Sequence, residues 1–154
     1  MVSLVVIEGI MLIVGVVTAG MLSNAVLGQV STFDSFLVKS TETQKDILLT
    51  KTKIIYATNS SDVTSEIWVK NIGDNTLGSL DKMDLFFGKE DQTQRITYNA
   101  GTNPTWSIEG DPLIWKPSDT LKIILTNDVT FESGLYTVIV TAPNGVECTY
   151  ILTI

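Results

Sequence analysis

The chain has 154 residues and a formal net charge of −7, with 10 basic and 17 acidic side chains and no histidine. Without histidine it lacks the most common neutral-pH base and metal ligand, and its acidic balance offers no basic stripe for phosphates. No nucleophile-and-base pair and no glycine-rich phosphate loop can be found. We therefore expect neither an enzyme, nor a nucleic-acid partner, nor a metal or cofactor. The single Cys148 cannot form an internal disulfide and is expected to be an unreactive thiol.

Residues 2–28 form an almost unbroken apolar run with one acid, Glu8, and no lysine or arginine precedes Lys39. This run exceeds the roughly 20 apolar residues that cross a bilayer. A secretory signal would begin with a basic region, which is missing. Two explanations stay open: a basic leader was removed before Met1, or the unprocessed chain inserts with its N-terminus outward.

From Gln29 to about Leu49 apolar residues recur at spacings of three and four, which is typical of an amphipathic helix. No proline interrupts residues 1–103, so we predict one continuous helix over residues 1–49, about 70 Å long at 1.5 Å per residue. That length exceeds a single membrane crossing. The second half must therefore leave the bilayer and pack one face against another surface.

From Thr50 onward the apolar period becomes two and β-branched residues dominate, with turn residues about every 8 to 12 positions. This pattern predicts an antiparallel Ig-like β-sandwich head over residues 50–154, and hence an α+β fold. Pro143-Asn144-Gly145 is the clearest hairpin signal. Strands are expected over residues 50–58, 63–71, 83–89, 94–98, 105–108, 120–126, 135–142 and 146–153. The intervening turns include residues 59–62, 73–75, 88–91 and 116–119.

Several short motifs resemble one family. Residues 4–8, LVVIE, are similar to the start of a processed type IV pilin, in which a glutamate is fifth, provided that the mature chain begins at Leu4. Residues 67–76 contain the V-K-N-x-G pattern of archaellins. Residues 115–121 are similar to their W-x-P-G-D turn, with serine in place of the glycine, and residues 134–146 match their final hairpin. The chain thus resembles the archaellin superfamily, archaeal relatives of type IV pilins that include the archaellum proteins FlaF and FlaG.

This resemblance implies a structural subunit of an archaellum-type, extracellular, type IV pilus-like filament for motility or adhesion. Such a subunit is inserted in the membrane before assembly, meets an assembly platform there, and then packs its helix against copies of itself. A second hypothesis is a membrane-anchored stator or envelope-binding protein of the FlaF or FlaG kind. A third is the head of a cell-surface adhesin.

Candidate assembly residues lie in the apolar run. Glu8 has two interpretations: an acid that reaches the membrane interface, or a partner for the N-terminal amine of a neighbouring subunit, since an intramembrane acid is costly when unpaired. Small side chains let apolar helices approach closely, although glycine is also common in membrane spans generally. The candidates are Glu8, Gly9, Gly15, Ala19, Gly20 and Ser23.

In the head, Asn59-Ser60-Ser61 is an N-glycosylation acceptor pattern within a predicted turn. The three tryptophans suggest a carbohydrate-binding surface, because exposed indoles stack on sugar rings, but core packing is the favoured interpretation. Trp68 lies in an alternating strand and is expected in the core. Trp106 and Trp115 flank a loop and are the candidates for a surface patch. Acid pairs such as Asp81 with Asp84 lack the ligand spacing of a calcium loop.

Overall fold

The structure, a computed structural model, describes residues 2–89 and 92–154. The predicted turn at 88–91 therefore lies partly outside the described residues. By their internal contacts the described residues form two units, one that ends at Gln44 and one that covers Lys45–Ile154. The second unit begins one helical turn before the boundary expected at residue 50, because the end of the helix contacts the head.

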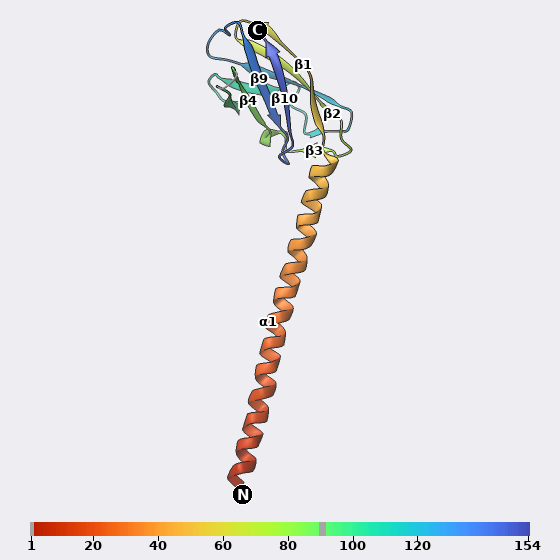
Figure 1. The fold of residues 1–154 in the computed structure, drawn as a ribbon, viewed down its shortest axis with the longest axis vertical. Coiled ribbons are helices and arrows are strands. Elements are labelled where there is room, and N and C mark those ends of the chain that lie inside the picture. The colour runs from red at the N-terminus through yellow and green to blue at the C-terminus, as the bar shows by residue number, and fades with distance from the viewer. Residues whose placement is uncertain (1, 90–91) are drawn as a thin grey trace. The chain divides into compact units, whose positions relative to one another are not determined.

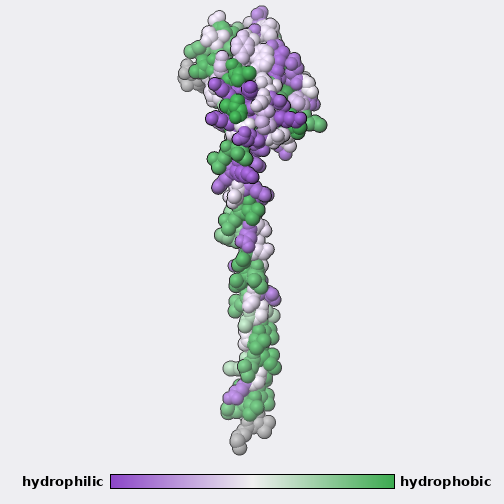
Figure 2. Space-filling model, turned by 90° about the vertical axis from the view of Figure 1, so that its right-hand side faces the viewer, coloured by the Kyte–Doolittle hydropathy of each residue, from purple (hydrophilic) through white to green (hydrophobic). Residues whose placement is uncertain are grey.

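A single helix, α1 (Val2–Leu49), contains 48 residues, as the uninterrupted sequence predicted. Its hydroxyl side chains bond back to carbonyls one turn earlier, as Thr18 does with Val14 O at 2.8 Å and Thr32 with Gly28 O at 2.9 Å. The segment Ser3–Leu49 is long and apolar enough to cross a membrane. An 18-residue stretch within it has a mean hydropathy of 2.3, and none of that stretch is buried. Figure 2 shows apolar side chains along most of this helix.

The head is built from short strands. Their bounds are β1 (Thr52–Ser61), β2 (Thr64–Asn71), β3 (Leu77–Gly78), β4 (Asp84–Lys89), β5 (Gln94–Tyr98), β6 (Thr105–Ile108), β7 (Ile114–Trp115), β8 (Thr120–Thr126), β9 (Leu135–Thr141) and β10 (Glu147–Thr153). A short 3₁₀ helix, η1, covers Leu80–Lys82. The sequence predicted the eight longer strands within two or three residues at each end. It missed β3, β7 and η1, which are too short to show a period.

Eight strands form one sheet in the order β1-β2-β8-β6-β5-β4-β9-β10. All pairs are antiparallel except β5 with β6, which run parallel. The two terminal strands of this order, β1 and β10, lie side by side (Figure 1), so the sheet folds over on itself as a sandwich. The α+β class is therefore confirmed, with one parallel pair within a mostly antiparallel head.

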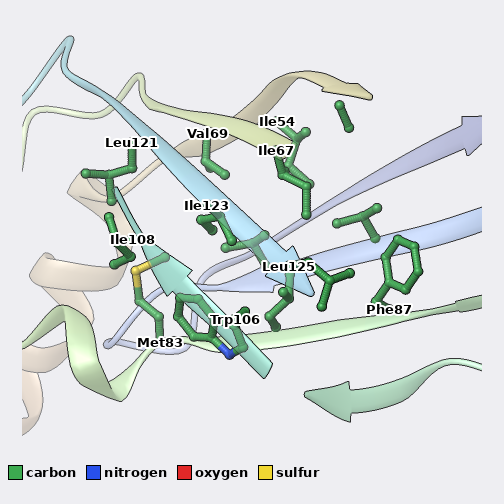
Figure 3. Close-up of a cluster of buried hydrophobic side chains, with 14 of the residues drawn as sticks. Ile54, Ile67, Val69, Met83, Phe87, Trp106, Ile108, Leu121, Ile123 and Leu125 are labelled. Carbon is green, nitrogen blue, oxygen red and sulfur yellow. The ribbon is translucent and has the colours of Figure 1, made fainter. Parts of the chain in front are cut away.

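The core fills the space between the two halves of the sheet. Alternate residues of β2, β8 and β9 are buried, because side chains on a strand point to opposite faces. Figure 3 shows the central cluster. Its labelled members are Ile54, Ile67, Val69, Met83, Phe87, Trp106, Ile108, Leu121, Ile123 and Leu125.

Candidate functional site

The candidate assembly residues all lie on α1. Glu8, Gly15, Ala19 and Ser23 fall on one face, and Gly9 and Gly20 lie about 100° around the helix, given 3.6 residues per turn. Apart from the adjacent residues and the backbone of the same helical turns, nothing in the described chain lies within 4 Å of a Cβ built on any of the three glycines. A single copy therefore gives no reason for glycine at these positions, and their role in packing stays a prediction.

A second site, which the sequence reasoning missed, holds the end of α1 against the head. We call it the helix-head junction and define it by Asp46, Leu49, Thr50, Gly73 and Asn144. The last carbonyls of a helix have no partners within the helix. Here Asp74 N–H donates to Leu49 O at 2.9 Å. Thr50 caps the C-terminal end of α1 as well, because its hydroxyl donates to Asp46 O at 2.7 Å.

The β9–β10 hairpin closes the junction from the other side. Asn144 Nδ2 donates to Thr50 Oγ1 at 2.7 Å and to Asp46 O at 3.3 Å. The turn itself is the predicted one, with Gly145 at a φ of 87° and its N–H bonded to Ala142 O at 2.9 Å. The clearest hairpin signal in the sequence thus also supplies a contact to the helix end.

Gly73 occupies the tightest point of the junction. A Cβ at this position would overlap Leu49 O and would lie 2.5 Å from Lys51 N, both backbone atoms. The residue before it, Ile72, donates its N–H to Lys51 O at 2.7 Å, which holds the start of β1 next to Gly73. The glycine of the V-K-N-x-G pattern is therefore required by close backbone approach.

Asn71 joins both archaellin-like motifs. Its side chain is fully buried and donates to Asn75 O at 2.8 Å and Trp115 O at 3.3 Å, while its Oδ1 accepts from Gly73 N at 3.1 Å. Its backbone N–H donates to Asp119 O at 3.0 Å. A buried amide whose donors and acceptor are all used fixes loops in one arrangement. The V-K-N-x-G and W-x-P-x-D segments thus form one hydrogen-bonded unit.

Ser118, which stands where the resemblance has glycine, adopts a φ of 70°. A left-handed backbone is strained for a residue with a Cβ, and this accounts for glycine in the family pattern. Its N–H nevertheless donates to Asn71 O at 2.9 Å. The serine is therefore held in place by the Asn71 network despite the strain.

The expectations for the tryptophans were wrong. Trp106 and Trp115 are 1% and 0% exposed, and their indole N–H groups donate to Ile96 O and Asp119 O at 3.0 Å each. They are core anchors and make no surface patch. Trp68, expected in the core, is only half-buried and lies on the outer face of β2. Register decides this: the inward positions of β2 are Ser65, Ile67, Val69 and Asn71.

Asn59 was expected in a turn, but it lies in β1 near the end of the β1–β2 hairpin, because β1 continues to Ser61. It is half-buried, and its Oδ1 accepts from Ser65 Oγ at 2.6 Å. Its modification stays a prediction. Burial raises the pKa of the Cys148 thiol, which favours the unreactive protonated form. Asp84 is paired with Arg95 at 2.6 Å, and the described residues contain no cluster of three or more metal-ligating side chains.

Comparisons with known proteins agree with the motif resemblance. A family model described as archaeal-type flagellin matches residues 5–151. The archaellum periplasmic stator protein FlaG from Sulfolobus acidocaldarius is similar, with a TM-score of 0.64 and 31% identity over 68% of this chain and 100% of that one. A chain of the FlaF and FlaG stator complex from the same organism matches with a TM-score of 0.63 and 31% identity, over 68% of this chain and 90% of that one. No curated protein sequence matches. A family match over nearly the whole length places the protein among structural archaellum components: the chain belongs to the archaeal-type flagellin family.

Proposed function

We propose that this protein is a membrane-anchored, non-enzymatic stator component of the archaellum, with its β head outside the membrane. The observation that carries the proposal is the 31% identity to FlaG over the whole of the solved FlaG chain. The head supplies the contacts, and residues 2–28 of α1 supply the anchor, since this stretch alone exceeds the roughly 20 residues of a span. The partner would be a related β head, as in the FlaF and FlaG complex.

The helix-head junction suits this role. A stator carries load between a membrane helix and an extracellular head, so the end of the helix has to be firmly attached to the head. The last turn of α1 is bonded to two head segments, through Asp74 and through Asn144. The last turn of α1 thus belongs to the head unit, which is the end of the helix that such a role needs to be attached.

A filament subunit is the second candidate function. It is favoured by Glu8 and by small residues on more than one face of α1, as a helix surrounded by neighbouring copies would need. In this case the subunit would leave the membrane through an assembly platform and bury its apolar helix in the core of an extracellular fibre. The gain of about 25 cal/mol per Å² of buried apolar surface would make its extraction very slow.

Shearing the source cells separates the two candidates. For a stator, quantitative mass spectrometry should find the chain in the membrane fraction and only in traces in the sheared fibres, and crosslinking should couple its head to a second β head. A chain that is the major protein of the fibres would overturn the stator proposal and support the filament subunit. The main archaellin of the same preparation serves as the control for complete fibre recovery.

A further inference from the structure

The outer face of β1, β2 and β8 carries aromatic and charged side chains. A register shift in β1 between Ile54 and Tyr56 produces a β-bulge. Because of it, two consecutive side chains point outward, with Ile55 47% and Tyr56 53% exposed. Bulges often re-aim side chains beside functional sites. The bulge here brings an aromatic ring onto the outer surface.

Three side chains form a row across these strands. Tyr56 pairs with Trp68, and Trp68 pairs with Lys122. The two ring centroids are 5.3 Å apart with planes tilted by 40°, and Lys122 Nζ lies 5.6 Å from the indole centroid. Trp68 therefore has a neighbour on each side, and the 53% exposed Tyr56 ring is the aromatic surface of the row that is open to a ligand.

Carboxylates border this row. Lys122 Nζ lies 3.2 Å from Glu66 Oε1 and 3.2 Å from Glu109 Oε1. The Glu109 side chain is 59% exposed, against 23% for Glu66 and Lys122. The outer face thus combines aromatic rings with an ammonium group and two carboxylates that keep free lone pairs and reach solvent.

We propose that this outer face, defined by Tyr56, Trp68, Lys122, Glu66 and Glu109, binds carbohydrate. A pyranose ring presents a row of C–H groups that packs on the electron-rich face of an aromatic ring. The hydroxyl groups of the sugar can donate hydrogen bonds to the Glu66 and Glu109 carboxylates and accept one from the Lys122 ammonium group. The two carboxylates disfavour phosphate-bearing ligands. The proposal goes beyond the function given above and holds for a stator and for a filament subunit alike.

Of the three tryptophans, only Trp68 lies on this outer face. Trp106 and Trp115 are sealed in the core and cannot contact a glycan. Trp68 is the remaining indole, and it shares its face with the exposed Tyr56. The ligand would be a neutral glycan.

Titration of the full-length protein tests this, in lauryldimethylamine oxide micelles because a maltoside detergent would itself present sugar. The probes are chitotriose and mannotriose, with open-chain sorbitol as a polyol that has hydroxyls but no ring. We expect saturable shifts of the Trp68 indole N–H resonance with at least one trisaccharide, half-complete near about 1 mM. The Trp106 and Trp115 resonances and the sorbitol titration should show no such change.

Variants identify the surface. Tyr56→Ala removes the exposed ring and should abolish trisaccharide binding, whereas Glu109→Gln should weaken it about tenfold. Trp68→Ala removes the side chain that packs beside Tyr56 and should also weaken binding. Ile151→Ala, a change of a 62% exposed side chain on β10, is the matched control and should bind normally. Absence of a saturable shift with either trisaccharide would overturn the proposal. So would unchanged affinity in a folded Tyr56→Ala variant, or recognition of this face only by another protein in crosslinking.

Discussion

The Asn144 side chain donates a 2.7 Å hydrogen bond to Thr50 Oγ1, across 94 positions of sequence. This contact joins the final hairpin of the head to the residue that caps the helix. Thr50 itself is 5% exposed and bonded to Asp46 O, so the three residues form a short chain of hydrogen bonds. The last turn of α1 is therefore part of the folded head.

Replacing Asn144 by alanine should lower the free energy of unfolding of the head by about 1–2 kcal/mol, because Thr50 Oγ1 loses the Asn144 donor and Asp46 O keeps only its bonds from Thr50. Chemical denaturation followed by tryptophan fluorescence measures this. The control is Asn127→Ala, which removes a local, exposed bond to Val129 O and should change stability by less. Equal effects of the two substitutions would mean that the junction contact adds nothing.

Gly73→Ala should be more damaging. The new Cβ would overlap the backbone at Leu49 and Lys51, which no side-chain rotation can relieve. We expect a loss of about 2–3 kcal/mol, in the range of other overpacking and backbone effects. Gly78→Ala is the matched control, because its Cβ would meet nothing within 4 Å. A Gly73→Ala variant with the melting temperature of the unchanged protein would show that the close approach is easily relaxed.

Much of the head could be predicted because apolar and polar residues alternate regularly along its strands. In β2 each inward residue is buried and each outward residue half-exposed, and β5, β6 and β8 begin and end at the predicted residues. The parallel β5–β6 pair could not be predicted, because period two does not specify the strand neighbour. Composition also does not determine toward which face of the sheet an amphipathic side chain such as tryptophan points. Trp68 was assigned to the core for that reason, although it lies on the outer face.

The junction escaped prediction because it depends on contacts distant in sequence. Its residues were visible as family motifs and as a hairpin turn, but nothing in the sequence says that Asn144 reaches Thr50. Gly73, two residues after the end of β2, was the one available signal of close backbone approach. The β-bulge that exposes Tyr56 had no signal, since Ile54, Ile55 and Tyr56 form an unbroken apolar run.

Ser118→Gly should stabilise the protein, by up to about 1 kcal/mol, because glycine adopts a φ of 70° without the penalty of a Cβ. Thermal unfolding should show a rise of a few degrees. Ser118→Ala keeps the Cβ and the strain, so its melting temperature should stay near that of the unchanged protein. A Ser118→Gly variant that melts earlier would indicate that greater flexibility of the unfolded chain outweighs the relief of strain.

Gly15→Leu and Gly20→Leu test whether α1 packs against other helices. If it does, the large side chain should block assembly while the head stays folded, because a close helix contact cannot absorb it. Native gels of detergent extracts and fibre counts on cells report assembly, and circular dichroism reports the head. Val14→Leu, at a position that is 55% exposed in the single chain, is the control. Normal assembly of both glycine variants would place these residues against lipid.

The last prediction concerns where the head begins. A fragment of residues 45–154 should fold as a monomeric, mostly β domain and melt at a higher temperature than a fragment of residues 50–154. The shorter fragment lacks Asp46 O and Leu49 O, the acceptors for Asn144, Thr50 and Asp74. Their loss should cost about 1–3 kcal/mol, which corresponds to several degrees for a domain of this size.

Adding Asn144→Ala to both fragments completes a double-mutant cycle. The substitution should cost less in residues 50–154, because one of the two Asn144 acceptors, Asp46 O, is already gone. Equal melting temperatures of the two fragments, or equal costs of Asn144→Ala in both, would contradict a head that starts at Lys45. Aggregation of both fragments would contradict a head that folds by itself.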